Sequence, residues 1–327
     1  MTGPILAPIL IADLGGTHLR FALTDGQTTR EESSMEGNRF ATLEDAVGAY
    51  LAKIGPGIRP DRAIFAVAGP SDAETMVFTN RDWTVPVAPL RDRFELTQLA
   101  VVNDFAAVAY ALPQLTEADY RTVGADRPAR PGPMVAIGPG TGLGVGLVVP
   151  DGAGIRVIPG EGGHATLPAQ NGLEERVIGY LRNLHGHVSA ERALSGAGLA
   201  DLHDAVCAVE DLPARRLDAA AIVADGATDP GCREAIGLFT DFLATVAGDL
   251  ALTAAASGGV YIAGGMVPKL GDLFDGGRFR RRFTAKGRLA GYLDPIPVRL
   301  ITHHEPALLG LSRSAESILT RDLDTSV

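Results

Sequence analysis

Cysteine is scarce in this chain of 327 residues: Cys207 and Cys232 are the only two. Two cysteines at no paired spacing are too few for a disulfide framework, and the pattern shows none of the partners of a structural zinc site. The start, Met1-Thr2-Gly3-Pro4, has no basic residues before an apolar stretch, which argues against a secretory signal. These absences predict a protein of the reducing cytoplasm.

Long apolar runs and positive charge are also scarce. Apolar residues make up 46% of the chain, but the uninterrupted runs stop well short of the ~18–20 residues that span a bilayer. The net charge of −10, from 29 basic and 39 acidic residues, disfavours a broad nucleic-acid footprint. We therefore expect neither a membrane nor a nucleic-acid partner. Only three basic residues are lysines (Lys53, Lys269 and Lys286), which we attribute to genome composition.

Glycine, by contrast, is abundant, with 40 residues in 327, against about 7% in ordinary proteins. Many of these glycines fall between short apolar runs. Residues 8–13 and 19–23 flank Gly15-Gly16, and residues 134–137 and 145–149 flank the stretch 138–144. Strand, glycine turn and strand predict two β-hairpins, a faint repeat that is consistent with two similarly built domains.

The other apolar patterns predict strands and helices in alternation. Strands are expected at 62–68, 99–102, 258–265 and 298–301, and helices at 104–112, 173–184, 239–250 and from Pro306 onward. Tight hairpins together with strand–helix alternation predict a mixed α/β sheet. The proline-rich stretch 112–133 is the expected domain boundary.

Three glycine loops are candidates for phosphate binding: residues 13–17, 138–142 and 263–266. Glycine lets backbone N–H groups converge on an anion without a Cβ in the way, and Thr17 and Thr141 could add hydroxyl donors. Asp13 beside such a loop suits a magnesium ion held directly or through water. For each loop alone an ordinary hairpin turn is the alternative. No Gly-Lys-Ser/Thr is present, which excludes Walker A NTPases.

Four acidic or histidine side chains are candidates for chemistry. Asp104 follows a buried strand and opens a helix, so it is either the N-cap of that helix or a general base for phosphoryl transfer, and the two roles are compatible. Glu161 and His164 lie in a glycine-rich bend, where they either contact hydroxyls of a ligand or are ordinary loop residues. From its position alone Glu191 is a solvated acid at a helix start. His303 and His304 are expected to be structural.

Taken together, these motifs resemble the bacterial glucokinase family, of the hexokinase–actin–heat-shock-ATPase fold. The matching blocks run in order along nearly the whole chain: 13–17, 79–83, 102–105, 140–144, 159–164, 190–196, 259–265 and 303–310. The resemblance implies a two-domain α/β fold of the actin-like, ribonuclease H-like ATPase type, with mixed sheets flanked by helices and an interdomain cleft that closes on the sugar. The implied smaller domain is 1–114 plus 306–327, and the larger is 115–305.

The resemblance also implies a reaction and its residues. The reaction is phosphorylation of D-glucose at its 6-hydroxyl by ATP with Mg²⁺, and Asp104 is the general base. The implied sugar-binding residues are Asn80, Asn103, Asp104, Glu161, His164 and Glu191. The implied ATP-binding residues are Ala12, Asp13, Leu14, Gly15, Gly16, Thr17, Gly140, Thr141, Gly142, Gly264 and Gly265. No side chain is expected to bind a metal directly, Asp13 acting through water, and a homodimer is implied.

The sequence departs from the family pattern at three positions and leaves alternatives open. Position 18 is histidine where the family often has asparagine, and Glu305 and Ala307 stand where asparagine and glycine are common. The zinc-binding cysteine cluster of the related repressor–kinase sugar kinases is absent, since two isolated cysteines cannot supply it. The alternatives are a kinase of another hexose or an aminosugar, and a non-catalytic sugar sensor on the same fold.

Overall fold

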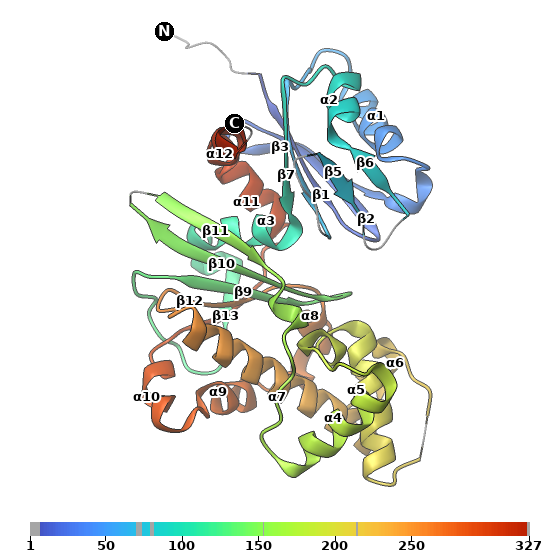
Figure 1. The fold of residues 1–327 in the computed structure, drawn as a ribbon, viewed down its shortest axis with the longest axis vertical. Helices are drawn as coiled ribbons and strands as arrows, with labels where there is room; N and C mark the ends of the chain where they lie inside the picture. The colour runs from blue at the N-terminus through green and yellow to red at the C-terminus, as the bar shows by residue number, and fades with distance from the viewer. Residues whose placement is uncertain (1–6, 70–73, 79–81, 153, 214, 326–327) are drawn as a thin grey trace. The chain divides into compact units, whose positions relative to one another are not determined.

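The computed structural model describes residues 7–69, 74–78, 82–152, 154–213 and 215–325 (Figure 1). The chain forms two compact units, unit 1 (Met1–Leu115 with His303–Val327) and unit 2 (Thr116–Thr302). Unit 1 is therefore built from two separate stretches of the chain. That these units are also independent domains, near the boundaries expected from the sequence, stays a prediction.

Unit 1 contains a five-stranded sheet. The strand order is β3 (Thr29–Glu36), β2 (His18–Thr24), β1 (Ile9–Leu14), β4 (Arg62–Val67) and β7 (Gln98–Asn103). Strands β1, β4 and β7 are parallel, whereas β2 pairs antiparallel with both β1 and β3. The predicted first hairpin is thus confirmed, and Leu14 pairs with Leu19 across it. Unit 1 also contains a separate two-stranded antiparallel sheet, formed by β5 (Thr75–Val77) and β6 (Thr84–Pro86).

Five helices belong to unit 1: α1 (Leu43–Ile54), α2 (Val87–Arg93), α3 (Asp104–Ala111), α11 (Pro306–Arg313) and α12 (Ala315–Thr325). Helix α11 begins at Pro306, as expected, and packs against α3. The two backbones approach closely at Gly310, where a Cβ would lie 2.0 Å from the Ala107 carbonyl oxygen. Only glycine permits this approach, which fixes α3 against a segment almost 200 residues later in the chain.

Unit 2 contains a six-stranded mixed sheet. The strand order is β11 (Gly154–Gly160), β10 (Leu143–Asp151), β9 (Met134–Pro139), β12 (Gly259–Ile262), β13 (Val298–Ile301) and β8 (Tyr120–Thr122). Strands β9, β12 and β13 are parallel, and β9 and β10 form the predicted second hairpin. The remaining helices of four or more residues are α4 (Gly172–His185), α5 (Gly196–Val209), α6 (Ala219–Asp225), α7 (Pro230–Thr253), α8 (Met266–Leu270), α9 (Gly276–Thr284) and α10 (Ala290–Leu293).

Helix α7 is the core helix of unit 2. By length and composition it is the one described helix that could cross a membrane, but 78% of its most apolar window is buried inside the protein. Phe239, Phe242 and Leu243 on this helix are fully buried and belong to the large apolar cluster of the unit. The helical spacing seen in the sequence therefore marks a helix that is surrounded by protein.

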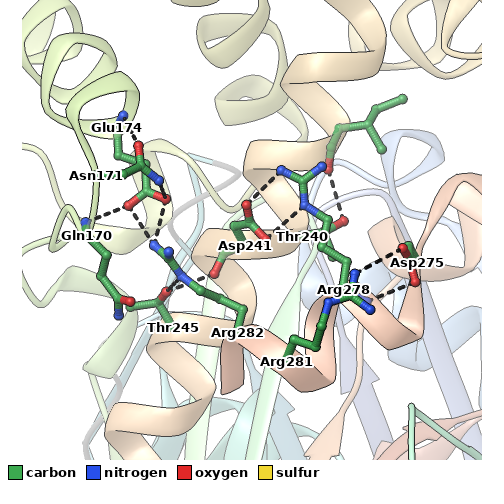
Figure 2. Close-up of polar contacts among 11 residues, drawn as sticks. Gln170, Asn171, Glu174, Thr240, Asp241, Thr245, Asp275, Arg278, Arg281 and Arg282 are labelled. Carbon is green, nitrogen blue, oxygen red and sulfur yellow. Dashed lines mark hydrogen bonds and ion pairs between the residues drawn. The ribbon is translucent and has the colours of Figure 1, made fainter. Parts of the chain in front are cut away.

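Helices α4, α7 and α9 are joined by one buried and one partly buried ion pair (Figure 2). The Glu174 carboxylate has no exposed surface, and both of its oxygens lie 2.6 Å from Nη2 of Arg282. Arg282 Nε also donates to Thr245 Oγ1 at 2.8 Å. Nearby, Arg278 on α9 binds both carboxylate oxygens of Asp241 on α7, at 2.9 and 2.7 Å. Each buried charge thus has an opposite charge beside it, the condition under which such burial is tolerated.

Candidate active site

The carboxyl ends of the parallel strands in unit 1 bring two of the predicted motifs to one edge of the sheet. Residues 62–67 of β4 pair with 9–14 of β1 on one side and with 98–103 of β7 on the other, in parallel. The glycine turn after β1 and the Asn103-Asp104 pair after β7 therefore leave the sheet at the same edge. Open α/β sheets place their ligand sites at this edge.

Asn103 and Asp104 have different local roles. The N-cap of α3 is Asn103, whose Oδ1 accepts from the backbone N–H groups of Phe105 and Ala106 at 2.9 and 3.1 Å. Asp104 is the first residue of the helix, and its Oδ1 accepts from the Phe105 N–H at 2.8 Å. The interpretation of Asp104 as the N-cap is therefore wrong. Asn103 Oδ1 accepts from two N–H groups of the helix start, and Asp104 shares the N–H of Phe105.

Asp13 belongs to a group of three charged side chains at the first hairpin. Arg20 lies opposite Asp13 on β2, and its Nη1 donates to Asp13 Oδ2 at 3.1 Å. The Nε atom of Arg20 lies 2.9 Å from Oε2 of Glu305, one of the positions at which the sequence departs from the family pattern. Burial raises the pKa of both carboxyls above their usual range, and the guanidinium opposes the shift in each case.

The turn of the first hairpin exposes backbone to solvent. Gly16 and Thr17 are exposed, and Gly15 N–H donates to the His18 carbonyl at 3.1 Å. A Cβ at Gly15 would lie 3.2 Å from that carbonyl oxygen, so the turn is tight. His18, the unusual residue after the turn, is exposed at the start of β2. The turn thus has the form expected of a phosphate loop, and its ligand stays a prediction.

In unit 2 the other two glycine loops lie side by side. They follow β9 and β12, which are parallel neighbours, and Ala263 N–H donates to the Ile137 carbonyl at 2.8 Å. Gly264 has φ of +79°, and a Cβ there would lie 2.5 Å from the Pro139 carbonyl oxygen. Glycine is therefore required at this position both by backbone conformation and by contact. Gly265, next in the chain, is exposed.

A cavity of about 890 Å³ opens beside these two loops, entirely within unit 2. Its lining includes Gly140, Thr141, Gly265 and the start of α5 at Gly196. The Gly196 N–H donates to the Gly140 carbonyl at 2.9 Å, which fixes the helix start to the loop. A glycine loop at a helix N-terminus is suited to phosphate binding, since both present N–H groups to an anion.

Sequence reasoning missed three parts of this cavity wall. They are the start of α5, the start of α6 next to Asp218, and Lys269 on α8. Ser195 is a residue type that favours helix starts, so it could have indicated the start of α5. Its Oγ caps α5 by accepting from Gly198 N–H at 3.0 Å. Lys269 was set aside as one of three lysines explained by composition, although it is the one that lines this cavity.

Glu191 is held against the 138–144 loop. It lies in the short 3₁₀ helix η5 (Ala190–Arg192), and its Oε2 accepts from the Leu143 N–H at 2.9 Å. A Cβ at Gly142 would lie 2.5 Å from the same oxygen. The interpretation of Glu191 as a solvated acid is therefore wrong. Glu191 is a predicted sugar ligand, and its half-buried carboxylate contacts the backbone of a predicted phosphate loop.

Glu161 and His164 lie at a bend that packs on the same loop. The 3₁₀ helix η4 (Gly162–His164) contacts both β10 and η5, and a Cβ at Gly163 would lie 2.0 Å from the Leu143 carbonyl oxygen. Oε2 of Glu161 and Nε2 of His164 are 3.8 Å apart, and both side chains are more than half exposed. Glu161, His164 and Glu191 thus lie around one segment, with two of the three open to solvent.

Two further predictions concern residues outside these groups. Asn80 lies outside the described residues, so its predicted role in sugar binding stays untested. His303 accepts at Nδ1 from the Glu305 N–H at 3.1 Å, a turn contact that agrees with the structural role expected of it. Nε2 of His304 lies 3.5 Å from Glu305 Oε1, and its side chain is 95% exposed.

Comparison with known proteins gives consistent matches over nearly the whole chain. The family model described as Glucokinase matches residues 10–318. A glucokinase of Nitrobacter hamburgensis is 44% identical over 305 residues, which are 93% of this chain and 95% of the relative. A glucokinase of Aromatoleum aromaticum is 44% identical over 322 residues, 97% of each chain.

Solved structures agree with the sequence comparisons. The crystal structure of a glucokinase from an Antarctic psychrotroph has a TM-score of 0.85 at 35% identity, covering 95% of this chain and 99% of that one. A glucokinase from Balamuthia mandrillaris, solved in complex with glucose, has a TM-score of 0.78 at 19% identity over 96% and 94% of the two chains. At that identity the second likeness concerns the fold alone. The predicted α/β fold class of the sugar-kinase, actin-like ATPase type is confirmed.

Proposed function

The chain belongs to the glucokinase family and is a glucose-phosphorylating enzyme, and on that premise we propose that Asp104 is the general base of its reaction. The observation that carries this proposal is the position of Asp104. It is the first residue of α3, at the carboxyl edge of the parallel strands, where open α/β sheets place their ligand sites. A carboxylate at this edge is suited to accept the proton of a sugar hydroxyl.

We propose that the phosphoryl group comes from ATP and goes to the 6-hydroxyl of D-glucose. The proton of that hydroxyl passes to the Asp104 carboxylate as the oxygen attacks the γ-phosphorus, and ADP leaves with the bridging oxygen. Such reactions depend mainly on positioning and electrostatics, because the transition state spreads its charge over the phosphoryl oxygens. Backbone N–H groups of the glycine loops at 13–17 and 138–144 supply that environment in this proposal.

The proposed sugar ligands are an amide, two carboxylates and an imidazole. Asn103 in unit 1 uses its Oδ1 for α3, so its amide nitrogen is the group left to donate to a hydroxyl. In unit 2, Glu191 uses Oε2 for Leu143, which leaves Oε1 to accept from the sugar. Glu161 and His164 supply an exposed acceptor and an exposed ring nitrogen beside it. Carboxylates and amides of this kind suit vicinal hydroxyls.

The cavity in unit 2 is the proposed site for the nucleotide. Its wall carries Gly140, Thr141 and Gly265 of the predicted ATP residues, together with apolar side chains of α5 and α6 and the ammonium of Lys269. Apolar walls with a few polar groups are typical of cofactor sites, and a lysine suits phosphate. Gly264 shapes the loop that borders this wall.

The donor set also fits a magnesium ion held through water. Asp13 Oδ2 is bound by Arg20, so Oδ1 is the oxygen that can accept from a metal-bound water. A single carboxylate suits Mg²⁺, which keeps several of its waters and takes other ligands from the phosphates. When bound with the nucleotide, the ion neutralises phosphate charge. The carboxylate must be ionised for this purpose; burial raises the pKa of Asp13, and Arg20 opposes that rise.

Steady-state kinetics of Asp104→Asn with glucose and ATP tests the proposed base. We expect kcat to fall by about 10²–10⁴ with a much smaller change in KM, because the variant keeps the shape of the side chain but cannot take the proton. Asp126→Asn makes the same charge change at an exposed position outside the site and should keep wild-type rates. Near-normal turnover of Asp104→Asn would overturn the assignment.

A panel of glucose, mannose, fructose and glucosamine tests the substrate, with ATP as donor and kcat/KM as readout. The proposal expects glucose to be the best substrate. A higher kcat/KM for another sugar would reassign the enzyme within the hexose kinases. Saturable glucose binding without ADP formation would indicate a sugar sensor on this fold.

We also propose a cytoplasmic homodimer. The presence of only two cysteines in the sequence supports a cytoplasmic location, and the family resemblance supports a dimer. Sedimentation of the purified chain across a range of concentrations tests the dimer, and a single monomeric species at every concentration would contradict it.

A further inference from the structure

Four potential metal ligands meet at the contact between α5 and α7, outside the site described above. His203 and Cys207 lie one turn apart on α5, Asp229 is the N-cap of α7, and Cys232 lies in the first turn of α7. Within the part of the chain that the structure describes, His203, Asp229 and Cys232 are the one group of histidine, cysteine and acidic residues whose ligand atoms all lie within 4.8 Å of one another. Cys207 lies outside that group of three, and its Sγ contacts the Nε2 atom of His203.

The distance between His203 and Cys207 suits two ligands of one tetrahedral ion. His203 Nε2 lies 3.6 Å from Cys207 Sγ, and a tetrahedral zinc ion with bonds of about 2.3 Å to sulfur and about 2.0–2.1 Å to nitrogen separates those atoms by about 3.5 Å. Gly231 leaves the necessary space. A Cβ there would lie 3.1 Å from Cys207 Sγ, 3.3 Å from Asp229 Oδ1 and 3.5 Å from His203 Nε2. A side chain at position 231 would therefore crowd three of the four proposed ligand atoms, and glycine avoids this.

Outer contacts orient two of these groups as in known metal sites. His203 Nδ1, the ring nitrogen on the other side, lies 3.4 Å from Asp204 Oδ1. A metal-binding histidine almost always donates its second N–H to a carboxylate or carbonyl, which fixes the tautomer and aims the first nitrogen at the metal. Asp229 is held in turn by Arg215, whose Nη1 lies 3.3 Å from Oδ2.

Burial makes this cluster unusual for a protein without a bound ion. His203, Cys207 and Cys232 are 1%, 4% and 0% exposed. Burial raises the pKa of both thiols, that of Cys232 to about 11. The nearby guanidinium of Arg215 offsets the negative charge that two thiolates and a carboxylate leave around a doubly charged ion.

We propose that His203, Cys207, Asp229 and Cys232 bind one thiophilic divalent cation of the Zn²⁺ class, which ties α5 to the start of α7. Mixed nitrogen and sulfur ligands select this class over Mg²⁺ and Ca²⁺. The sequence analysis found no metal partners for the cysteines because the ligands come from two helices that the fold brings together. The site is structural in geometry, with four protein ligands and no position left for a substrate.

The ion would also stiffen one wall of the cavity in unit 2. Helix α5 contributes Gly196, Ala197 and Ala200 to that wall and carries His203 and Cys207 further along. Fixing its far end to α7 restricts the tilt of the whole helix. The proposal does not depend on the assigned activity, because it concerns only side chains that contact one another away from the predicted substrate residues.

Cobalt titration of the purified, metal-stripped full chain tests this proposal. We expect roughly one Co²⁺ per chain with a thiolate-to-cobalt charge-transfer band in the near ultraviolet, and displacement of the cobalt by Zn²⁺. In Cys207→Ala and Cys232→Ala the band should be weaker, and it should be absent from the double variant. Zn²⁺ should raise the Tm of the wild type, and a chelator should reverse the rise.

Two further measurements keep the test decisive. His185→Gln removes a histidine at the end of α4 whose Nε2 lies 2.7 Å from Asp201 Oδ2 on α5, away from both thiols, and this variant should bind cobalt like the wild type. Circular dichroism of each cysteine variant shows whether it is folded, and only folded variants are compared. A wild type without the charge-transfer band, or a band that persists in the folded double variant, would overturn the proposal and leave a metal-free thiol–imidazole cluster.

Discussion

At the junction of β7 and α3, two adjacent polar side chains occupy different positions at the start of the helix. Asn103 supplies the oxygen that the helix start requires, and Asp104 is the first residue of the helix. The sequence could place this pair at a strand end, but the choice of capping residue depends on backbone angles. Asn103 has the extended conformation of an N-cap, with φ of −66° and ψ of 146°, and this cannot be inferred from residue types alone.

Glu191 offers a test at the same scale, because its two oxygens have separate tasks in our proposal. Glu191→Gln keeps an oxygen for the Leu143 N–H but loses the charge, so we expect KM for glucose to rise about tenfold, as for a lost charge-assisted hydrogen bond. Glu191→Ala also releases the 138–144 loop, so KM for ATP should rise as well. Separate titrations of the two substrates give both values.

The matched control for this series is Glu175→Gln. Glu175 is an exposed acid in the first turn of α4, and the same charge change there should leave both KM values unchanged. If Glu191→Gln kept the wild-type KM for glucose, Glu191 would not be a sugar ligand.

From the contacts of Arg20 with two partly buried carboxylates we predict that the stability of the protein depends on pH. Asp13 and Glu305 have folded pKa values raised above the ordinary 3.8 and 4.5, so the folded protein holds these protons more tightly than the unfolded chain does. Stability therefore falls as pH rises from about 4 through the folded values. Removing Arg20 raises both pKa values further. In Arg20→Gln we expect a larger loss of unfolding free energy between pH 4 and 7, measured with urea.

The control for Arg20→Gln is Arg39→Gln. Arg39 forms an exposed ion pair with Glu36, so its substitution should leave the slope of stability against pH unchanged. Parallel profiles for Arg20→Gln and the wild type would contradict the proposed role of Arg20.

At the scale of elements, the sequence predicted the buried strands and the edge strand β7, and missed the more exposed edge strands β3 and β11. Strands β1, β4 and β12 are continuous apolar runs, and the structure has them close to their expected bounds. Strands β3 and β11 lie at sheet edges, and most of their residues are exposed or half-buried. Edge strands have little apolar surface to cover, so they show no clear alternation from which they could be recognised.

Two helical glycines show what composition alone could not explain. A Cβ at Gly237 in α7 would lie 2.4 Å from Nη1 of Arg278, and one at Gly248 would lie 2.8 Å from the Phe283 carbonyl oxygen. Both positions are where α9 approaches α7. The sequence offered no reason for these glycines, because the partner helix lies 30 or more residues away along the chain. Their reason is close packing, not conformation.

The buried pair between α4 and α9 predicts a large effect on stability. Arg282→Met leaves the carboxylate of Glu174 buried without its counter-charge (Figure 2), so we expect a loss of about 3–5 kcal/mol in unfolding free energy. The double variant Glu174→Leu with Arg282→Met removes both charges and should recover part of the loss. Urea unfolding at neutral pH measures all three proteins.

A surface pair on the same helix is the control. Arg176 on α4 pairs with Glu210, and both side chains are substantially exposed. Arg176→Met should therefore cost less than about 1 kcal/mol. If Arg176→Met and Arg282→Met lost the same free energy of unfolding, burial of the pair between Glu174 and Arg282 would not explain the loss.

At the scale of the whole molecule, the two units differ in how the chain builds them. Unit 2 is a single continuous stretch with its own sheet and apolar cluster, whereas unit 1 needs residues 303–327 to cover α3 and the sheet. We expect the fragment 116–302 to fold alone, with a cooperative urea transition. The fragment 1–115 should be unstable, and joining 303–327 to it through a flexible linker should restore folding. Loss of structure in isolated 116–302 would show that the units are not independent domains.

The close contact of Gly310 with Ala107 has a consequence for biosynthesis. The helix that begins with Asp104 leaves the ribosome long before the segment that packs against it, with roughly 190 residues between them, or about 10–40 s of translation at 5–20 residues per second. During that interval the nascent chain exposes the apolar face of α3 while the intervening unit can already form. A chain that stalls before residue 303 would therefore keep this face uncovered, available to chaperones and proteases, and would leave α3 without the support of α11.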